Sequence, residues 1–342
     1  MTAPRKPVPD DAGNRLVTRR SVVALAVSAF SAPIFASMSP RGATAASSGG
    51  AAQVAPGVFV HTGEHAHSYT AANLGDISNN GFIVGRDAVA VIDTGGTAAY
   101  GRRLRDAIRA VTDRPVRYVI NTHMHPDHVL GNAAFRADAP RFVGHHKLAA
   151  ALSARAERYL SFNREQTGPE GFAGTEIVLP DLAVETTLEL DLGDRILRLE
   201  AHRTAHTDND LTVRDMATDT VFMGDLIFSG HVPTLDGSIR GWIALLEHMK
   251  SRPAARIVPG HGPASMAWPD AALPLERYLG AIAADVRKAI KAGRTLSDTL
   301  ATAASGERDQ WELFDGFHAR NVSAAFAELE WEIGRASCRE RV

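Results

Sequence analysis

Four residues that bind metal ions well lie within one stretch of six: His123, His125, Asp127 and His128. They follow the apolar run 116–120, whose pattern predicts a buried strand. In an extended chain, side chains two residues apart point the same way, so His123 and His125 can share one metal ion. Asp127 and His128 then lie where the chain turns into the next helix, and they face a second ion. Imidazoles with a carboxylate suit zinc, although iron and manganese accept similar ligands.

Three further candidate ligands adjoin short apolar segments later in the chain: His206, Asp225 and His261. His206 stands just before a strand-like segment, Asp225 ends an apolar run, and His261 lies near the end of Ile257-Val-Pro-Gly-His-Gly262. Because each adjoins a predicted strand, all three can converge at one edge of a sheet, where loops usually carry function. The pattern therefore predicts a metal site assembled from distant segments.

The stretch from His123 to His128 resembles the H-x-H-x-D-H signature of the metallo-β-lactamase superfamily, and Thr122 and Gly131-Asn132 extend the resemblance towards its glyoxalase II-like branch. The resemblance implies two metal ions, expected to be Zn²⁺ with Fe or Mn as alternatives, joined by one bridging carboxylate. The implied ligands are His123, His125 and His206 for the first ion, Asp127, His128 and His261 for the second, and Asp225 as the bridge.

Other residues have supporting roles by resemblance. Asp93 ends a strand-like segment, and in the resembled family an aspartate here buttresses the metal loop rather than binding metal. The Gly-rich turn after Asp93 completes neither nucleotide-loop pattern. The loop after Asp225 resembles that of quinoprotein relay system zinc metallohydrolases, which are related to accessory proteins of sulfur oxidation. His231 and Asp236 in that loop are candidate substrate-pocket residues, with a purely structural loop as the alternative.

The predicted chemistry is hydrolysis without a protein nucleophile. Two divalent ions sharing Asp225 can hold a hydroxide at neutral pH, because coordination lowers the pKa of water to about 7. Asp127 and Asp225 are the expected catalytic residues, and Asp127 is expected to orient the hydroxide. The chain contains no G-x-S-x-G elbow. A thioester, lactone or related ester is the expected substrate. The alternatives are a β-lactam hydrolase, a single-iron sulfur dioxygenase, and a non-enzymatic protein that holds metal for a quinoprotein system.

The alternation of strands and helices fits the α/β fold that the resemblance implies, a four-layer αββα sandwich over residues 55–331 with a helical C-terminal portion. Leu104, Ile108 and Val111 predict a helix before the motif strand, and residues 275–290 form one apolar helical face. The segments 163–174 and 228–241 are expected to be loops that wall the pocket. His145 and His146 open another predicted helix, and exposed imidazoles explain them better than metal binding does.

The two ends of the chain differ from the body. Thr18-Arg-Arg-Ser21 precedes the apolar segment 22–35 and a small-residue cleavage site, which predicts a twin-arginine export signal over residues 1–45. Residues 46–54 are expected to be a loose linker. The segment 332–342 lacks apolar periodicity, and we interpret it as non-native sequence, which resequencing would test. The only cysteine, Cys338, lies there, so the body contains neither a disulfide nor a thiolate ligand.

Charge is also unevenly distributed. Residues 1–45 carry a net charge of +4 and residues 332–342 carry +1, so a total of −2 leaves −7 on the body. An acidic body argues against binding to nucleic acid or to anionic membrane surfaces. The expected partners are a small-molecule substrate and a periplasmic quinoprotein or sulfur-oxidation system, with no stable membrane insertion once the signal is removed. The expected location is periplasmic or secreted.

Overall fold

The computed structural model describes residues 50–339, with side chains described through residue 332. The export signal predicted over residues 1–45 lies outside the described residues. Between residues 50 and 339, no helix combines the length and the apolar character that crossing a bilayer requires.

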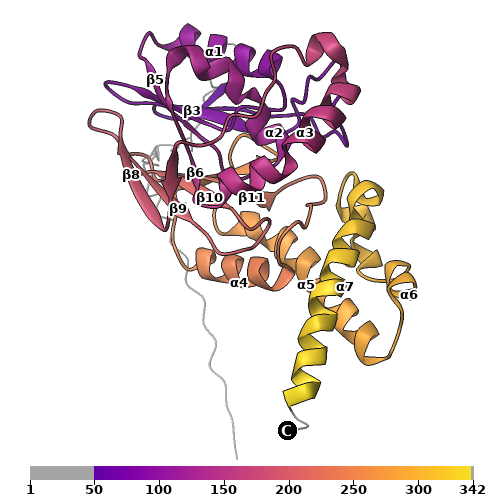
Figure 1. The fold of residues 1–342 in the computed structure, drawn as a ribbon. Helices are drawn as coiled ribbons and strands as arrows, with labels where there is room; N and C mark the ends of the chain where they lie inside the picture. Colours follow the sequence, from indigo (N-terminus) through magenta and orange to yellow (C-terminus); the bar gives the residue numbers. More distant parts are fainter. Residues whose placement is uncertain (1–49, 340–342) are drawn as a thin grey trace, which may run out of the picture. The chain divides into compact units, whose positions relative to one another are not determined.

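Seven strands form the first sheet, in the order β1-β2-β3-β4-β5-β6-β7 (Figure 1). Neighbouring strands pair antiparallel from β1 to β4 and parallel from β4 to β7. Parallel pairing needs a crossover connection, which α1 (Ala98–Val111) supplies between β4 and β5. The strands are β1 (Ala52–Ala55), β2 (Val58–His61), β3 (Asn80–Val84), β4 (Val89–Ile92), β5 (Val116–Ile120), β6 (Arg141–His145) and β7 (Leu182–Val184).

Five strands form the second sheet, in the order β12-β11-β10-β9-β8. All neighbours pair antiparallel except β11 and β12, which are parallel. The helix α4 (Ile239–Lys250) makes that crossover. The strands are β8 (Thr187–Asp191), β9 (Ile196–Ala201), β10 (Leu211–Asp215), β11 (Thr220–Phe228) and β12 (Arg256–His261).

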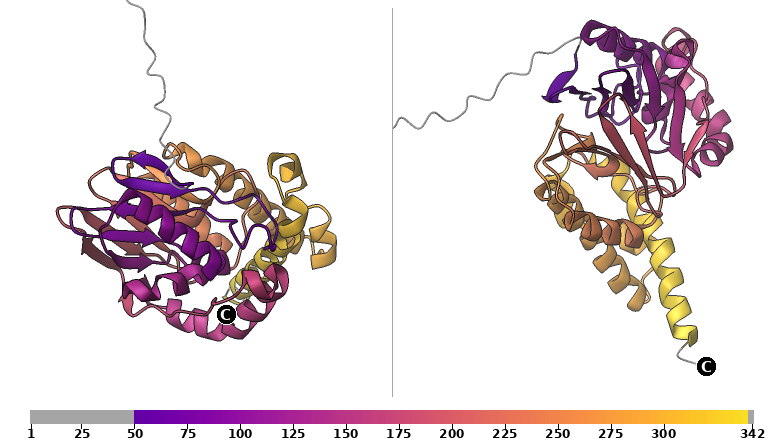
Figure 2. Two further views of the ribbon diagram at one scale, coloured as in Figure 1. Left: turned by 90° about the horizontal axis from the view of Figure 1, so that it is seen from above. Right: turned by 90° about the vertical axis from the view of Figure 1, so that its left-hand side faces the viewer.

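Apolar side chains from the inner faces of both sheets fill one core, which includes Ile83 and Ile120 from the first sheet and Leu199 and Val213 from the second. The helix α1 covers the other face of the first sheet, and α4, α5 and α7 cover the other face of the second (Figures 1 and 2). This arrangement confirms the predicted four-layer αββα sandwich with a helical C-terminal portion.

The remaining helical segments lie between the strands or after β12. The C-terminal portion is tied together by α5 and α7, whose buried apolar faces meet in one cluster with β11 and α4. The segments are α2 (Pro126–Val129), η1 (Leu130–Asp138), α3 (Leu148–Gly171), η2 (Asp270–Ala272), α5 (Leu273–Lys291), α6 (Leu296–Leu300), η3 (Ser305–Gln310) and α7 (Phe314–Arg339).

Two expectations from the sequence are wrong in detail. The linker predicted to reach residue 54 ends earlier, because residues 52–55 form β1 through backbone pairing with β2, which their Ala-rich composition does not prevent. The segment 163–174 is not a loop, since most of it belongs to α3. Gly168 breaks the helical geometry with a φ of 76°, and Pro169 then starts a new turn, a position that proline favours.

The positions of two other predicted features also differ. His145 is the last residue of β6 and is buried, rather than exposed at a helix start, because α3 begins only at Leu148. The segment 332–342, predicted to be non-native, begins within α7, which continues to Arg339. Helical backbone says nothing about the origin of a sequence, so that interpretation stays a prediction.

Candidate metal centre

The histidine-rich motif occupies a tight connection between β5 and α2. Pro126 begins α2, where its restricted φ and missing N–H are well tolerated, and residues 121–125 form a short loop with bends at 122–124. Met124 is fully buried in a cluster with Val129 and Leu130. The rings of His123 and His125, on either side of Met124, lie 4.7 Å apart. These two imidazoles therefore lie together as their spacing predicted, although bends at residues 122–124 replace the expected extended chain.

The seven residues expected to be ligands gather in two adjacent groups. In each group, one nitrogen or oxygen from every member lies within 4.8 Å of the others. His123 and His125 lie in the loop after β5, Asp127 and His128 in α2, and His206 in the loop between β9 and β10, while His261 ends β12. Asp225 lies within β11, which continues to Phe228 instead of ending at this residue as the sequence suggested. The first group is His123, His125, His206 and Asp225, and the second is Asp127, His128 and His261.

The carboxylate of Asp225 stands between the groups. Its Oδ1 lies 3.1 Å from His128 Nε2 and 3.4 Å from His261 Nε2. Its Oδ2 lies 3.3 Å from His206 Nε2 and 3.6 Å from His123 Nε2. One oxygen therefore faces each group, which is the arrangement that a bridging carboxylate needs.

Two glycines give Asp225 this position. Gly224 has a φ of +51° and interrupts the regular pairing of β11 with β12, so the strand bulges beside Asp225. On the neighbouring strand, a Cβ atom at Gly260 would lie 2.0 Å from Asp225 Oδ1. A side chain at residue 260 would therefore displace the carboxylate.

The hydrogen-bond partners of His125 and His206 define their tautomers. His206 Nδ1 donates to the carbonyl oxygen of Thr234 (2.8 Å), and His125 Nε2 donates to the carboxylate of Asp236 (3.1 Å). The other nitrogens, His206 Nε2 and His125 Nδ1, lie 3.0 Å apart with a lone pair on each. Two nitrogen ligands of a tetrahedral zinc ion stand roughly 3.3 Å apart, given Zn–N bonds of about 2.0–2.1 Å. A shared cation resolves the repulsion between these lone pairs.

The buried carboxylate of Asp93 orients one histidine of each group. It accepts hydrogen bonds from Thr122 N (2.8 Å), Thr122 Oγ1 (2.7 Å) and His128 Nδ1 (2.8 Å). Because the Thr122 hydroxyl donates to Asp93, it accepts from His123 Nδ1 at 3.0 Å. Both histidines then direct Nε2, the nitrogen that Asp93 and Thr122 leave free, to the centre. Carboxylate support of this kind is common behind metal-binding histidines.

The electrostatics of the centre favour a bound cation. Burial opposes charge on His128, yet the carboxylates of Asp225 and Asp127 raise its pKa well above the ordinary value. Burial also favours a neutral Asp225, yet His261 and His128 hold the pKa of Asp225 well below the ordinary range. Burial lowers the pKa of His206 to about 3. Without a cation, the carboxylates hold protons on part of the cluster, and divalent ions would take over that role.

These residues fit divalent metal ions. Among the described residues, His123 Nε2 is buried and has no hydrogen-bond partner, and His128 Nε2 and Asp225 Oδ1, also buried, lie 3.1 Å apart without hydrogen-bond geometry. Buried polar atoms are normally paired, so these atoms indicate a ligand that accepts electron pairs. Imidazole nitrogens and carboxylate oxygens are the donors that zinc, iron and manganese use.

The two residues predicted to line the pocket both lie beside the centre. The ring of His231 is 4.6 Å from that of His261, and its Nδ1 donates to Val232 O. Burial, with His261, lowers the pKa of His231 to about 3, so this imidazole is neutral at physiological pH. Asp236 contacts His125 directly, a partnership that the sequence did not indicate.

Two tyrosines near Asp127 were also missed by the sequence reasoning. Tyr69 is buried, and its Oη has no hydrogen-bond partner among the described residues. Burial, and then Asp127, raise the pKa of Tyr69 well above the ordinary value, and burial raises that of Tyr159. Both phenols therefore keep their protons. Nothing in the local sequence around either residue indicates this placement.

His145 and His146 belong to neither metal group. His145 Nε2 donates to His202 O (3.1 Å), and its Nδ1 accepts from Lys147 N (3.1 Å). Its ring also stacks on His146 at 4.2 Å. Local hydrogen bonds thus occupy both nitrogens of His145.

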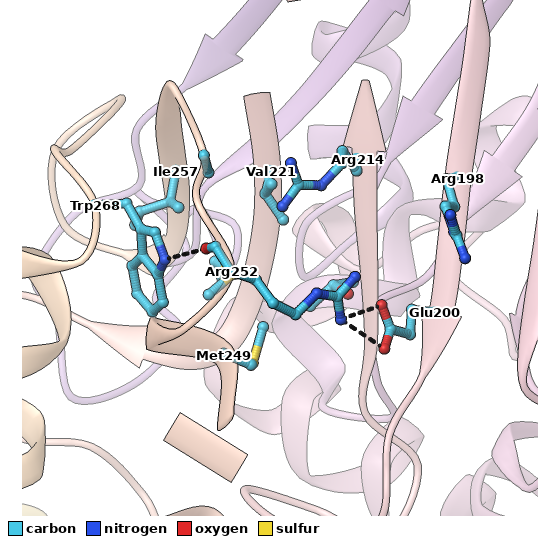
Figure 3. A pocket seen from close by; sticks show the side chains of 11 residues that line it. Arg198, Glu200, Arg214, Val221, Met249, Arg252, Ile257 and Trp268 are labelled. Carbon is cyan, nitrogen blue, oxygen red and sulfur yellow. Dashed lines mark hydrogen bonds and ion pairs between the residues drawn. The ribbon is translucent and has the colours of Figure 1, made fainter. Parts of the chain in front are cut away.

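A separate small pocket lies on the outer face of the second sheet (Figure 3). Its volume of about 30 Å³ is close to that of one water molecule. Arg252 Nη1 donates to both carboxylate oxygens of Glu200, at 2.8 and 2.7 Å, and Trp268 Nε1 donates to Arg252 O. Arg252 and Glu200 both line the pocket, and their charged groups are already paired with each other. None of the seven expected ligands is among the residues that line this pocket.

Comparison with known proteins agrees with this geometry. Residues 74–261, more than half of the chain, match the metallo-beta-lactamase superfamily domain. A metallo-beta-lactamase from Pontibacter korlensis superposes with a TM-score of 0.54 at 18% identity, covering 67% of this chain and 98% of its own. The protein TMB-1 superposes with a TM-score of 0.52 at 19% identity, covering 67% of this chain and 96% of its own.

Two sulfatases are also similar. A double mutant of the sec-alkyl sulfatase PisA1 superposes with a TM-score of 0.61 at 16% identity, covering 81% of this chain and 49% of that protein. A segment of 49 residues is 33% identical to the linear primary-alkylsulfatase of a Pseudomonas species. That match spans 14% of this chain and only 9% of the alkylsulfatase.

The chain belongs to the metallo-beta-lactamase superfamily. The family match and the hydrolases among the similar proteins support a metal-dependent hydrolase.

Proposed function

We propose that this protein is a dinuclear zinc hydrolase that cleaves a thioester, a lactone or a related ester. The observation that carries the proposal is the carboxylate of Asp225, with one oxygen towards each group of imidazoles. A single ion needs only one of the groups. Two complete groups sharing a carboxylate favour two ions.

Within this proposal, His123, His125 and His206 hold the first ion, Asp127, His128 and His261 hold the second, and Asp225 bridges them. When bound, the two ions supply a water acidified to a pKa of about 7 and an electrophile for the carbonyl oxygen. No protein nucleophile is needed.

The protein itself supplies orientation. Asp93 engages Nδ1 of His128 directly and Nδ1 of His123 through Thr122, so Nε2 of each ring points to where a metal ion would bind. The Asp127 carboxylate, with Oδ2 3.4 Å from His261 Nε2, lies where it can accept a hydrogen bond from the attacking water. His231 stays neutral and donates its Nδ1 proton to a backbone carbonyl, so it does not act as the general acid.

Asp225 also bears on the substrate class. By family resemblance, β-lactamases generally lack a bridging carboxylate at this position, which makes a β-lactam the weaker candidate. A second candidate is a sulfate ester, because the local match of 33% identity is to an alkylsulfatase. Release of inorganic sulfate from an alkyl sulfate, measured beside thioester and lactone hydrolysis, separates the two.

Elemental analysis of the mature protein, purified without added metal, tests the proposal. We expect about two zinc ions per chain and hydrolysis of at least one thioester or lactone. About one iron per chain, with oxygen uptake on a persulfide, would favour a sulfur dioxygenase. Tightly held metal without any hydrolysis would favour the non-enzymatic accessory protein.

We further propose that the protein is exported by a twin-arginine signal and acts in the periplasm or outside the cell, near a quinoprotein or sulfur-oxidation system. The paired arginines before an apolar segment support the route. Fractionation with the two arginines changed to lysine tests it, and unchanged export would contradict it.

A further inference from the structure

The loop 229–238, between β11 and α4, accepts hydrogen bonds from two histidines of the first metal group, His125 and His206. The carbonyl oxygen of Thr234 accepts the Nδ1 proton of His206, and the carboxylate of Asp236 accepts the Nε2 proton of His125. The backbone of Asp236 also donates to His206 O at 3.0 Å. The position of this loop therefore sets the direction of two imidazole lone pairs.

The C-terminal helix α7 holds the loop through two adjacent residues. Asn321 is buried, donates to Pro233 O (2.7 Å) and accepts from Leu235 N (2.9 Å), so it fixes the backbone on both sides of Thr234. Arg320 Nη2 lies 3.2 Å from Asp236 Oδ1, while Asp236 Oδ2 faces His125. The carboxylate of Asp236 is thus held between the guanidinium and the imidazole.

A third residue of α7 anchors the far end of the loop. Glu328 accepts from Ser238 Oγ (2.7 Å) and from Ile239 N (2.8 Å), where α4 begins. Leu235 is buried in the same apolar cluster as Val322 and Leu329 of α7. The loop is therefore docked on α7 along its whole second half.

Resting on the proposed function, we propose that α7 is a positioning element of the metal centre. Arg320 acts through Asp236 on His125, and Asn321 acts through Thr234 on His206. The superfamily match ends at His261, whereas α7 spans Phe314–Arg339. A segment beyond the matched domain thus completes the support of the first metal group, whereas Asp93 supports one histidine of each group.

The alternative is that Arg320 forms an ordinary surface ion pair. Its side chain is 58% exposed, and exposed pairs usually contribute little to stability. A positioning role makes a different prediction, because loss of a residue behind a metal-binding histidine typically weakens metal affinity or activity 10- to 100-fold. Metal affinity, rather than stability, distinguishes the two roles.

The test is titration of the metal-free full chain with Co²⁺ against a chromophoric chelator, for the wild type and for Arg320→Ala, Arg320→Lys and Asp236→Asn. In a His125→Ala variant, the cobalt-binding step that weakens is the one that belongs to the first metal group, because His125 is a member of that group. Arg308→Ala is the matched control, because Arg308 is 56% exposed and pairs with Asp315, which is not a residue of the loop 229–238. The visible spectrum of the cobalt protein reports the coordination geometry.

We expect Arg320→Ala and Asp236→Asn to raise the Kd of the first step about 10-fold, and to change its cobalt spectrum, with the second step within about twofold of wild type. Arg320→Lys should recover part of the loss, and Arg308→Ala should match the wild type. A wild-type Kd and spectrum in Arg320→Ala would overturn the inference alone, whatever Asp236→Asn shows, because only Arg320 belongs to α7. A wild type that binds no cobalt would overturn the proposed function and this inference with it.

Discussion

Asp93→Asn is the most informative single substitution for the metal centre. The change keeps the size and shape of a side chain that is 1% exposed, but it removes one acceptor oxygen and the negative charge. In the wild type, Oδ1 accepts from Thr122 N, and Oδ2 accepts from both Thr122 Oγ1 and His128 Nδ1. If the Asn oxygen keeps the backbone bond, its NH₂ group meets two donors.

The size of the effect follows from these contacts. Each hydrogen bond to a charged group contributes about 1.5–3 kcal/mol, and the variant loses one behind each group: directly at His128, and through Thr122 at His123. Loss of such support typically costs 10- to 100-fold in metal affinity, or about 1.4–2.7 kcal/mol per ion. We therefore expect the Kd values of both ions to rise by that factor.

Competition with a chelator measures both dissociation constants, and circular dichroism checks that the variant is folded. Asp87→Asn is the matched control, because it removes an exposed carboxylate that pairs with Arg86 at the surface. Wild-type Kd values for both ions in a folded Asp93→Asn protein would refute the argument. A loss confined to the second ion would refute the link through Thr122 to His123.

Three further outcomes are expected. Asp225→Ala should lose the second metal or most of the activity while the fold survives, and elemental analysis with turnover measures both. His145→Ala should keep the full metal content, and a lost equivalent in the same analysis would contradict its local role. Arg195→Met should lower the free energy of unfolding at pH 7 by about 3 kcal/mol, because it leaves the fully buried Asp215 without its partner at 2.9 and 2.7 Å. Burial raises the pKa of Asp215, but Arg195 lowers it below 3.8 overall. The stabilisation from the pair is therefore present above pH 3.8 and disappears as the pH falls through the lowered pKa. Urea unfolding near pH 7 and near pH 3 measures this, and an equal loss of stability at both pH values would contradict it.

The resemblance carried by the motif at His123 implied the fold class and the seven ligands, and local patterns along the chain agreed with both. Short apolar segments mark the strands, and strands align their ends at sheet edges, so polar residues at those ends meet. His206 and His261 are found by this rule although they are far from the motif at His123. The bulge at Gly224 is harder to predict, since it arises from strand pairing and not from composition alone.

The supporting contacts could not be predicted in the same way. Asp236 lies 111 residues after His125, and Arg320 lies on a helix whose sequence shows only amphipathic spacing. Such partners are selected by tertiary packing, which leaves no local signal. The segment 163–174 fails for a related reason, because Gly168-Pro169 indicates a loop, whereas packing continues the helix on both sides.

The two sets of supporting contacts divide the metal centre differently, and this gives the experiments their combined strength. Asp93 serves one histidine of each group, so its loss should weaken both ions. The pair of Arg320 and Asp236 serves His125 alone, so its loss should weaken only the first. If both substitutions weaken both ions equally, the bridge through Asp225 couples the two sites so strongly that neither ion binds independently. Metal titrations of the two variants therefore distinguish separate support of two ions from one cooperative dinuclear unit.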